Sequence, residues 1–151
     1  MRIRPLEASD RDGFVELITE FYQHANNPIP AAPEIRKLFR NALEPQSNYH
    51  VVVAEAASQL VGIVSVTFGE SSYRTAPFAW CDDLLVLPTQ RRAGVGKRLL
   101  EAVIQRARDA GCSNVLLGVG ESDEQAQAFY RSLGFEDLKN RLYSLPLAER
   151  R

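Results

Sequence analysis

The feature that most constrains the fold is an apolar strand that leads into a basic helix start containing two glycines. Residues 84–98 read LLVLPTQRRAGVGKR. The strand is expected to end at Pro88, and a helix to begin at Gly94-x-Gly96. The first N–H groups of a helix have no internal partner, and the helix dipole adds partial positive charge there. Since glycine has no Cβ to block close approach, this segment suits a pyrophosphate.

Basic side chains flank this helix start, at Arg91, Arg92, Lys97 and Arg98. Cations near a helix N-terminus oppose the dipole, which costs a few tenths of a kcal/mol each. A bound anion removes that conflict. We therefore interpret the segment as an anion site, with solvated surface charge as the alternative.

A second segment supports a specific resemblance. Residues 126–135 read AQAFYRSLGF. Together with Arg91-x-x-Gly94-x-Gly96, this segment resembles the paired motifs of the GNAT superfamily of N-acetyltransferases. The specific resemblance covers roughly residues 80–136, and the N-terminal half fits only in its order of elements.

The resemblance implies that acetyl-CoA is the cofactor. Backbone N–H groups from Arg92 to Lys97 would hold its pyrophosphate, and the strand at Leu84, Leu85 and Val86 would pair with the pantetheine arm as another strand would. The alternative for this strand is an ordinary central strand. The implied cofactor-binding residues outside that strand are Arg91, Arg92, Ala93, Gly94, Val95, Gly96, Lys97, Arg98, Ala126, Phe129 and Tyr130.

The resemblance also implies catalytic roles. The N–H of Leu85 would polarise the thioester carbonyl, and Tyr130 would protonate the departing thiolate. Asp82 lies near the position at which relatives carry a general base. Binding a cationic acceptor is the competing role for Asp82, and a core aromatic is the alternative for Tyr130. Strict strand alternation predicts that Asp82 and Asp83 point to opposite faces.

The acceptor is the least constrained part of the reaction. Candidate substrate-binding residues are Phe21, Tyr22, His24, Tyr73, Trp80 and Asp82. Small amines, polyamines, aminoglycosides, amino acids, peptide N-termini and protein lysines all remain open, and the short chain favours a small molecule. Relatives often carry Asn seven residues before the tyrosine, where it contacts the cofactor. Asp123 stands at that position here, so this contact is not carried over.

Composition narrows the class of protein. The 151 residues carry a net charge of −1, with 11 acidic and 7 basic residues up to position 87 and 8 acidic and 11 basic residues after it. A local basic segment on a near-neutral chain suits a small polyanion and argues against nucleic acid. No apolar run approaches the roughly 20 residues of a membrane span. Residues 1–5 lack the apolar core of a signal peptide.

The two cysteines, Cys81 and Cys112, lack metal-ligand spacing, so no metal site is expected. They suggest free thiols in a reducing cytoplasm. The chain also offers no recognisable serine or cysteine nucleophile with its base, so a covalent acyl-enzyme is disfavoured.

Periodicity predicts a single mixed α/β (α+β) domain over residues 1–151. Strands are expected at 2–5, 49–55, 60–70, 78–86, 114–119 and near 142–145. Helices are expected after a cap at Ser9, from Pro33, over 94–110, and from about Asp123 to before Gly134. In the second helix, Ile35, Leu38 and Phe39 should form the apolar face. The resemblance implies a GNAT-like fold: a twisted mixed sheet of about six to seven strands with about four helices, splayed at the cofactor.

The sequence thus predicts a cytoplasmic, acetyl-CoA-dependent N-acetyltransferase. A primary amine would attack the thioester directly in a ternary complex. The alternatives are an acyltransferase that uses another acyl-CoA, and a non-catalytic CoA-sensing or partner-binding module. Homodimers are common in the family, so the resemblance leaves a homodimer open.

Overall fold

The structure is a computed structural model that describes residues 1–148. The chain divides into two compact units, Met1–Leu117 and Gly118–Arg151. The expected single domain over residues 1–151 stays a prediction.

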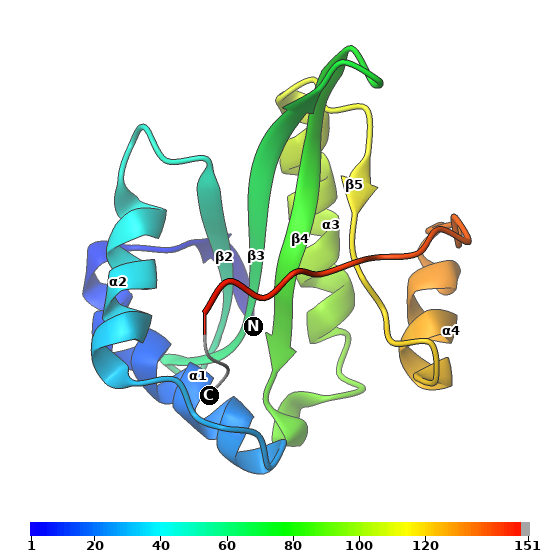
Figure 1. Cartoon of the computed structure of the whole chain (residues 1–151). Helices are drawn as coiled ribbons and strands as arrows, with labels where there is room; N and C mark the ends of the chain where they lie inside the picture. Colours follow the sequence, from blue (N-terminus) through cyan, green and yellow to red (C-terminus); the bar gives the residue numbers. More distant parts are fainter. Residues whose placement is uncertain (149–151) are drawn as a thin grey trace. The chain divides into compact units, whose positions relative to one another are not determined.

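The first unit is built on a five-stranded sheet in the order β1-β2-β3-β4-β5 (Figure 1). The strands are β1 (Arg2–Pro5), β2 (Tyr49–Ala56), β3 (Gln59–Ser71), β4 (Ala76–Val86) and β5 (Val115–Leu116). Neighbours from β1 to β4 are antiparallel, and β5 joins β4 in parallel. The sheet is therefore mixed, as the sequence predicts.

Helices α1 (Arg11–His24) and α2 (Ala32–Leu43) cover one face of the sheet. Helix α1 follows a short 3-10 turn, η1 (Ala8–Asp10). Apolar residues of α1 at spacings of three and four meet a row of strand side chains in one core cluster. Its buried members are Leu6, Phe14, Leu17, Ile18, Ile35, Phe39, Val51, Val53, Ile63 and Leu85.

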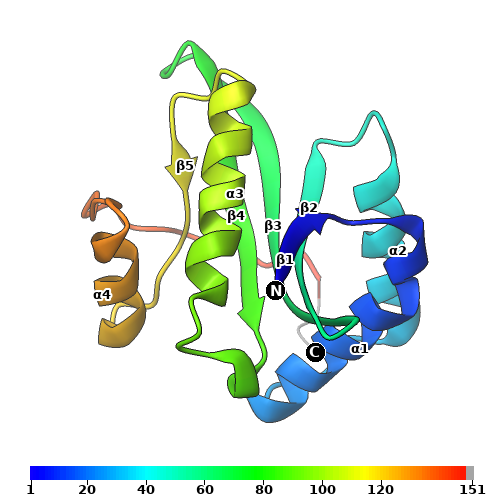
Figure 2. The ribbon, with the colours of Figure 1, turned by 180° about the vertical axis from the view of Figure 1, so that it is seen from behind.

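Helix α3 (Val95–Asp109) covers the opposite face, in front of the strands in the view from behind (Figure 2). It buries one stripe, made of Val95, Leu99, Leu100, Val103 and Ala107. The helix bounds match the predicted range 94–110 to within one residue at each end. Gly62 allows the close approach, because a Cβ there would lie 3.1 Å from both Leu99 and Val95.

The β2–β3 hairpin closes through Ala57 and Ser58, which both adopt positive φ (49° and 62°). Two central residues with positive φ define the turn that matches the right-handed twist of a hairpin. Ala56 pairs with Gln59 across it. The two strands that it joins agree with the predicted ranges 49–55 and 60–70 to within one residue at each end, and the turn lacks the glycine or asparagine that such turns favour.

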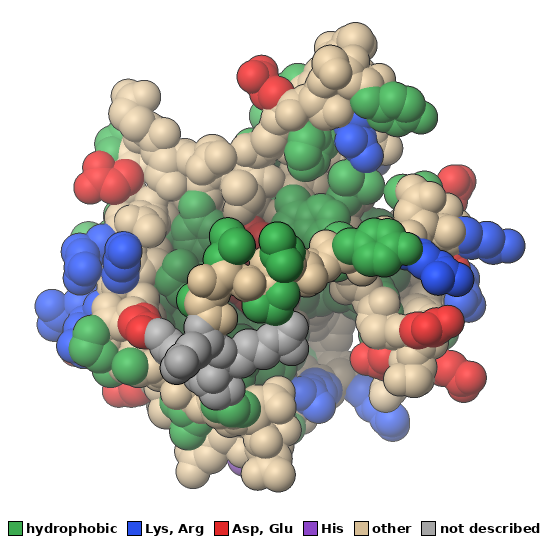
Figure 3. Space-filling view, viewed as in Figure 1, with side chains coloured by type: hydrophobic (Ala, Val, Ile, Leu, Met, Phe, Trp, Pro, Cys, Tyr) green, Lys and Arg blue, Asp and Glu red, His purple; other side chains and the backbone are tan. Residues whose placement is uncertain are grey.

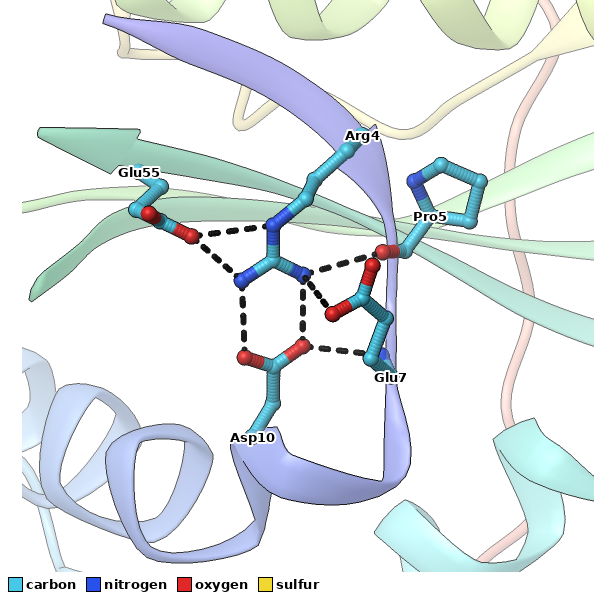
Figure 4. Close-up of polar contacts among 5 residues, drawn as sticks. All are labelled: Arg4, Pro5, Glu7, Asp10 and Glu55. Carbon is cyan, nitrogen blue, oxygen red and sulfur yellow. Dashed lines mark hydrogen bonds and ion pairs between the residues drawn. The ribbon is translucent and has the colours of Figure 1, made fainter. Parts of the chain in front are cut away.

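A buried ion-pair network joins β1 to its neighbours (Figure 4). The guanidinium of Arg4 donates to both carboxylate oxygens of Asp10, at 2.7 and 2.8 Å, and through Nε to Glu55 at 2.9 Å. The backbone N–H of Glu7 donates to Asp10 at 2.8 Å. The reciprocal contact at this helix start is made by Glu7 and Asp10, whereas the sequence predicted a cap at Ser9.

The second unit contains α4 (Glu124–Ser132). Asp123 caps it by accepting from the N–H of Ala126 at 3.0 Å, so the helix begins one residue after the predicted start at about Asp123. The chain beyond α4 forms no strand within the described residues, although one was expected near 142–145. Leu142, Tyr143 and Leu145 are exposed there, because no neighbouring strand supplies a ladder. The predicted β5 is likewise shorter than expected.

One predicted core residue lies at the surface. Leu38 on α2 is 41% exposed, whereas Ile35 and Phe39 are buried. Its place at the rim of a pocket, described below, accounts for that exposure. Among the described residues, no helix has the length and apolar character to cross a membrane. The same residues contain no cluster of side chains suited to a metal ion.

Candidate functional site

Strand β4 contains a bulge at its two carboxylates. Asp83 pairs with Ser65 on β3, while Cys81 pairs with Val66, so Asp82 is an extra residue in the ladder. A bulge of this kind sets two residues of one strand opposite one residue of the other. The alternation expected for adjacent strand residues therefore breaks at this point.

As a result the two carboxylates turn to the same face of the sheet. Ser65 Oγ donates to Asp83 at 3.1 Å, and Thr67 Oγ1 donates to Asp82 at 2.6 Å. Because Ser65 and Thr67 are two residues apart on one strand, their side chains share a face. The prediction that Asp82 and Asp83 point to opposite faces is wrong, and the bulge is the reason.

A pocket of about 440 Å³ lies on this face, between α1, α2 and β4. Hydrophobic side chains gather between α2 and the central strands in the space-filling view (Figure 3). The volume falls in the range typical of small-molecule sites. Its apolar lining comprises Ile18, Tyr22, Pro30, Ile35, Leu38 and Leu85.

The sheet contributes one charged group to the lining, the carboxylate of Asp83. Burial raises the pKa of Asp83, and the charge of Asp82 raises it further, while the hydrogen bond from Ser65 opposes both. Asp82 is exposed. The remaining polar lining residues, Glu34, Lys37 and Asn41, are exposed on α2.

Two tyrosines lie near these carboxylates. Burial raises the pKa of Tyr49 to about 12, with smaller contributions from Asp83 and Asp82 and an opposing hydrogen bond with Ser65. Burial also raises the pKa of Tyr22, and Asp83 adds to that effect. Both phenols therefore keep their protons at neutral pH and remain hydrogen-bond donors.

The predicted acceptor residues separate into two groups. Tyr22 lines the pocket with Asp83, and its ring meets Phe21 edge-on at 5.7 Å. Trp80 pairs with Thr67 on β3, two residues before Asp82. Of the predicted acceptor residues, Tyr22 alone belongs to the lining of this pocket; the residues outside it are Phe21, His24, Tyr73, Trp80 and Asp82.

Tyr73 lies in the turn between β3 and β4 and is 89% exposed. His24 ends α1 and is also exposed, with Nε2 3.6 Å from Glu20. The Tyr73 turn also stands at the opposite end of β4 from Leu85.

The predicted anion loop has an open backbone. After the 3-10 turn η2 (Pro88–Gln90), Gly94 takes a left-handed conformation (φ 79°) and precedes α3. No side chain caps the N-terminus of α3, and a Cβ on Gly94 would meet nothing within 4 Å. Arg92 also has positive φ (65°). The segment thus presents accessible N–H groups, which fit a phosphate.

Three basic side chains of this segment make long or exposed contacts. Arg91 Nε donates to the backbone carbonyl of Val86 at 3.4 Å, and Arg98 donates to that of Met1 at 3.3 Å. Lys97 Nζ lies 4.0 Å from a carboxylate one helical turn on, between exposed side chains. Contacts this long bind the cations loosely, so they stay available to an anion.

The free edge of β4 is defined by its ladder. The N–H of Leu87 donates to Val61 on β3 at 3.0 Å, and the register continues unshifted through Leu85. Because N–H groups alternate between the two edges of a strand, that of Leu85 also faces β3. Those of Leu84 and Val86 face the other edge. Within the described residues, β5 pairs with that edge only at Ala79 and Trp80.

In the second unit, Tyr130 lies among aromatic rings. Its ring centroid is 5.2 Å from that of Phe129 and 5.7 Å from that of Phe135. Asp123, the residue that replaces the family's asparagine, holds the N–H of Ala126. That helix cap gives Asp123 a structural role of its own.

Neither cysteine is built as a nucleophile. Cys81 and Cys112 are free, and burial raises the pKa of Cys81 to about 12. Burial also raises the pKa of Cys112. Since the thiolate is the reactive form, a thiol with so high a pKa is inert at neutral pH.

Comparison with known proteins shows the family to which the chain belongs. Residues 12–135 match the family model of the acetyltransferase (GNAT) family. A thialysine N-epsilon-acetyltransferase from Bos taurus is 27% identical over 146 residues, covering 90% of this chain and 84% of that protein.

Two solved structures share the fold. One, described as a probable acetyltransferase, has a TM-score of 0.85 at 24% identity and covers 99% of this chain and 100% of its own. The other is an aminoglycoside acetyltransferase from an uncultured soil metagenomic sample, in complex with sisomicin. It has a TM-score of 0.75 at 28% identity and covers 96% of each chain.

The chain belongs to the GNAT family of acetyltransferases. The family match spans most of the sequence, so the predicted fold class and the prediction of an N-acetyltransferase are confirmed.

Some residues of the pocket escaped sequence reasoning. The wall from α2, with Leu38 and Asn41, gave no signal beyond ordinary helical periodicity. Ser65 and Thr67 did give one, because two hydroxyls at alternate positions interrupt an apolar strand. Hydroxyls in that pattern predict a partner on the neighbouring strand, which here is the carboxylate pair.

Proposed function

We propose that the protein is an acetyl-CoA-dependent N-acetyltransferase that acts on a small primary amine by direct attack. The observation that carries this proposal is the composition of β4. Within five residues this strand carries a carboxylate facing the pocket, at Asp83, and outward backbone groups at Leu84 and Val86. The open helix start at Gly94 then follows.

Acetyl-CoA, when bound, would supply the acetyl group as an activated thioester. The N–H groups from Arg92 to Lys97 would hold its pyrophosphate, with Arg91 and Arg98 adding positive charge. The free edge of β4 would hold the pantetheine arm. The remaining implied contacts, at Ala93, Val95, Gly96, Ala126 and Phe129, are part of the same proposal.

Transfer would join the acetyl carbon to the acceptor nitrogen, break the C–S bond and release CoA as its free thiol. Asp82, directly or through water, takes the proton that the amine loses, and Tyr130 protonates the sulfur. An outward N–H on β4 stabilises the oxyanion. The ladder register favours Leu84 for that role over Leu85, whose N–H faces β3.

Two observations support direct transfer over the rival readings. The inert thiol of Cys81 argues against a covalent acyl-enzyme. The pocket argues against a module that only senses CoA, because such a module needs no second site. Free thiols at both cysteines fit a reducing compartment, so we place the reaction in the cytoplasm.

Thermal unfolding with acetyl-CoA tests the cofactor site. A ligand at about 100 times its Kd stabilises a protein by roughly 2.7 kcal/mol. Gly94→Glu should abolish that stabilisation, because it places bulk and negative charge at the phosphate. Gly111→Glu is the matched control, since Gly111 also has positive φ (75°) and open space at the other end of the same helix. Retained binding in Gly94→Glu would refute the phosphate loop.

Release of free thiol from acetyl-CoA across a panel of amines tests catalysis. Tyr130→Phe should lower turnover at least about tenfold and leave the Kd for acetyl-CoA nearly unchanged. Tyr143→Phe, at an 86% exposed residue, should change neither quantity. Unchanged turnover in Tyr130→Phe would remove the acid role.

A further inference from the structure

The pocket beneath α1 and α2 combines an apolar body with one inward charge. Its wall on one side is built from Ile18, Tyr22, Leu38 and Leu85. Asp83 is the sole carboxylate that the sheet contributes to it. The pocket is therefore apolar along its length and negatively charged at one point.

The charges on α2 add little to that balance. Glu34 and Lys37 line the outer wall three residues apart, and both are exposed. Their opposite charges sum to zero at the pocket mouth. Asp82 lies on the same face but is exposed and outside the lining. Within the lining, a ligand with several positive charges would find one net carboxylate, whereas a ligand with one positive charge is matched.

Asp83 has hydroxyl contact but no cation. Ser65 donates to it, and Tyr22 and Tyr49 lie close enough to feel its charge. No ion pair within residues 1–148 involves Asp83. Burying a carboxylate without a cation is unfavourable, and a ligand ammonium group would relieve that cost.

On the basis of the proposed acetyl transfer, we propose that the acceptor is a monoamine with an apolar body, whose ammonium group binds Asp83 while its apolar part lies against α1 and α2. Its nitrogen loses one proton to solvent before it attacks, and the second proton passes to Asp82 as the amide forms. Amines of the arylalkyl and alkyl type have this chemistry. Polyamines and aminoglycosides do not, because each carries several cations and little apolar surface. Asp83 is thereby a specificity-determining residue.

Binding of three probes to the full chain tests this assignment by calorimetry and thermal unfolding. The probes are 2-phenylethylamine, its uncharged counterpart 2-phenylethanol, and spermidine. We expect 2-phenylethylamine to bind at least about tenfold more tightly than either of the others, a difference of about 1.4 kcal/mol. Tighter binding of spermidine would overturn the proposal.

Variants then locate the two ends of the ligand. Asp83→Asn should weaken 2-phenylethylamine binding about tenfold and leave 2-phenylethanol unchanged. Leu38→Gln, at a residue already 41% exposed, should weaken both probes about equally. Asp12→Asn, at a carboxylate 82% exposed on α1, is the control for general charge effects. Equal affinity in wild type and Asp83→Asn would overturn the role of Asp83.

Binding and thiol-release measurements together distinguish a failure of this proposal from a failure of the proposed function. If acetyl-CoA stabilises the protein and thiol is released only with spermidine-like amines, the acetyl transfer stands and the monoamine proposal fails. If 2-phenylethylamine binds through Asp83 yet no amine releases thiol, the binding site stands and the catalytic proposal fails. Thiol release with 2-phenylethylamine that Asp83→Asn weakens through KM supports both.

Discussion

Two carboxylates of the first unit lie in opposite electrostatic surroundings. Asp10 is 7% exposed and receives two hydrogen bonds from the Arg4 guanidinium, which hold its pKa below the usual value against the effect of burial. Asp83 receives a single hydroxyl, from Ser65, and burial raises its pKa. The protein supplies a cation to the first carboxylate and none to the second.

The difference separates a structural charge from one that is open to a ligand. Arg4 joins Asp10 to Glu55 on β2, so its network ties β1 to the helix start (Figure 4). Asp83 borders an open pocket. A fold that provides a fixed counter-ion in one place and omits it in another leaves the second charge to pair with something that enters.

The largest expected effect comes from removing the structural charge. Asp10→Ala leaves the buried guanidinium of Arg4 with part of its network and frees the N–H of Glu7. Breaking a buried pair in this way costs about 3–5 kcal/mol. Chemical denaturation measures the loss, and Asp12→Ala, an exposed partner of Arg11, should cost less than about 1 kcal/mol.

A cost below about 1 kcal/mol for Asp10→Ala would mean that the network adds no more than a surface pair. Asp10 would then have no greater structural role than an exposed carboxylate, and the comparison with Asp83 would fail. Acetyl-CoA binding per mole of folded protein should stay unchanged in the variant, since Asp10 lies in neither proposed site.

The pH dependence of stability in acid should reveal the Arg4–Asp10 ion pair. The folded pKa of Asp10 is lowered from 3.8, so its contribution to stability is present above that value. It is lost as pH falls from about 3.8 through the folded pKa. Wild type should therefore lose stability faster than Asp10→Ala over this range, measured as the midpoint of urea unfolding at each pH. Parallel curves would contradict the assignment.

Asp83→Asn should change stability in the opposite direction, by raising the free energy of unfolding at neutral pH. The folded pKa of Asp83 is raised above 3.8, so the folded state holds the proton to higher pH than the unfolded state. Ionisation thus lowers the free energy of unfolding as pH rises through the folded pKa. Asn removes this penalty, and Asp83→Asn should gain up to about 1 kcal/mol at neutral pH.

Below pH 3.8 that gain should vanish, because both states of the wild type then carry the proton. Thermal unfolding of the two proteins at pH 3 and pH 8 measures the difference. A loss of stability at pH 8 would show that Asp83 is held as tightly as Asp10.

Thr67→Val should have the smallest effect. Thr67 donates to Asp82 at the exposed edge of the carboxylate pair, where water can replace it. We expect a loss of about 0.5 kcal/mol. Ser65→Val, at a fully buried hydroxyl, should cost more, and equal costs would show that the bulge exposes both carboxylates alike.

Segments with a repeated apolar spacing were predicted well, because that spacing determines whether a helix or a strand can bury one face. The helix over 94–110 and the strands at 49–55 and 60–70 were predicted from spacing alone. The short β5 and the absence of a strand near 142–145 did not follow, since pairing depends on a neighbour that local sequence does not specify.

The candidate site was only partly predictable. The glycines of the anion loop and the acidic pair of β4 are visible as residues. Their orientation is not, because a bulge leaves no mark in the apolar pattern. Leu38 shows the same limit, since helical spacing cannot tell a core residue from one at the rim of a pocket.

The bulge in β4 has a consequence for how this strand tolerates change. The bulge changes which edge of β4 the N–H groups of odd-numbered residues face. Before the bulge, the N–H of Ala79 points toward β5. After it, the N–H of Leu87 points toward β3. Deleting Asp82 would restore the simple alternation and reverse every residue on one side of the cut. The carboxylate in the pocket and the backbone donors at the open edge would be lost together. The extra residue thus keeps both the pocket carboxylate and the backbone donors in their positions. We therefore expect β4 to tolerate substitutions far better than insertions or deletions.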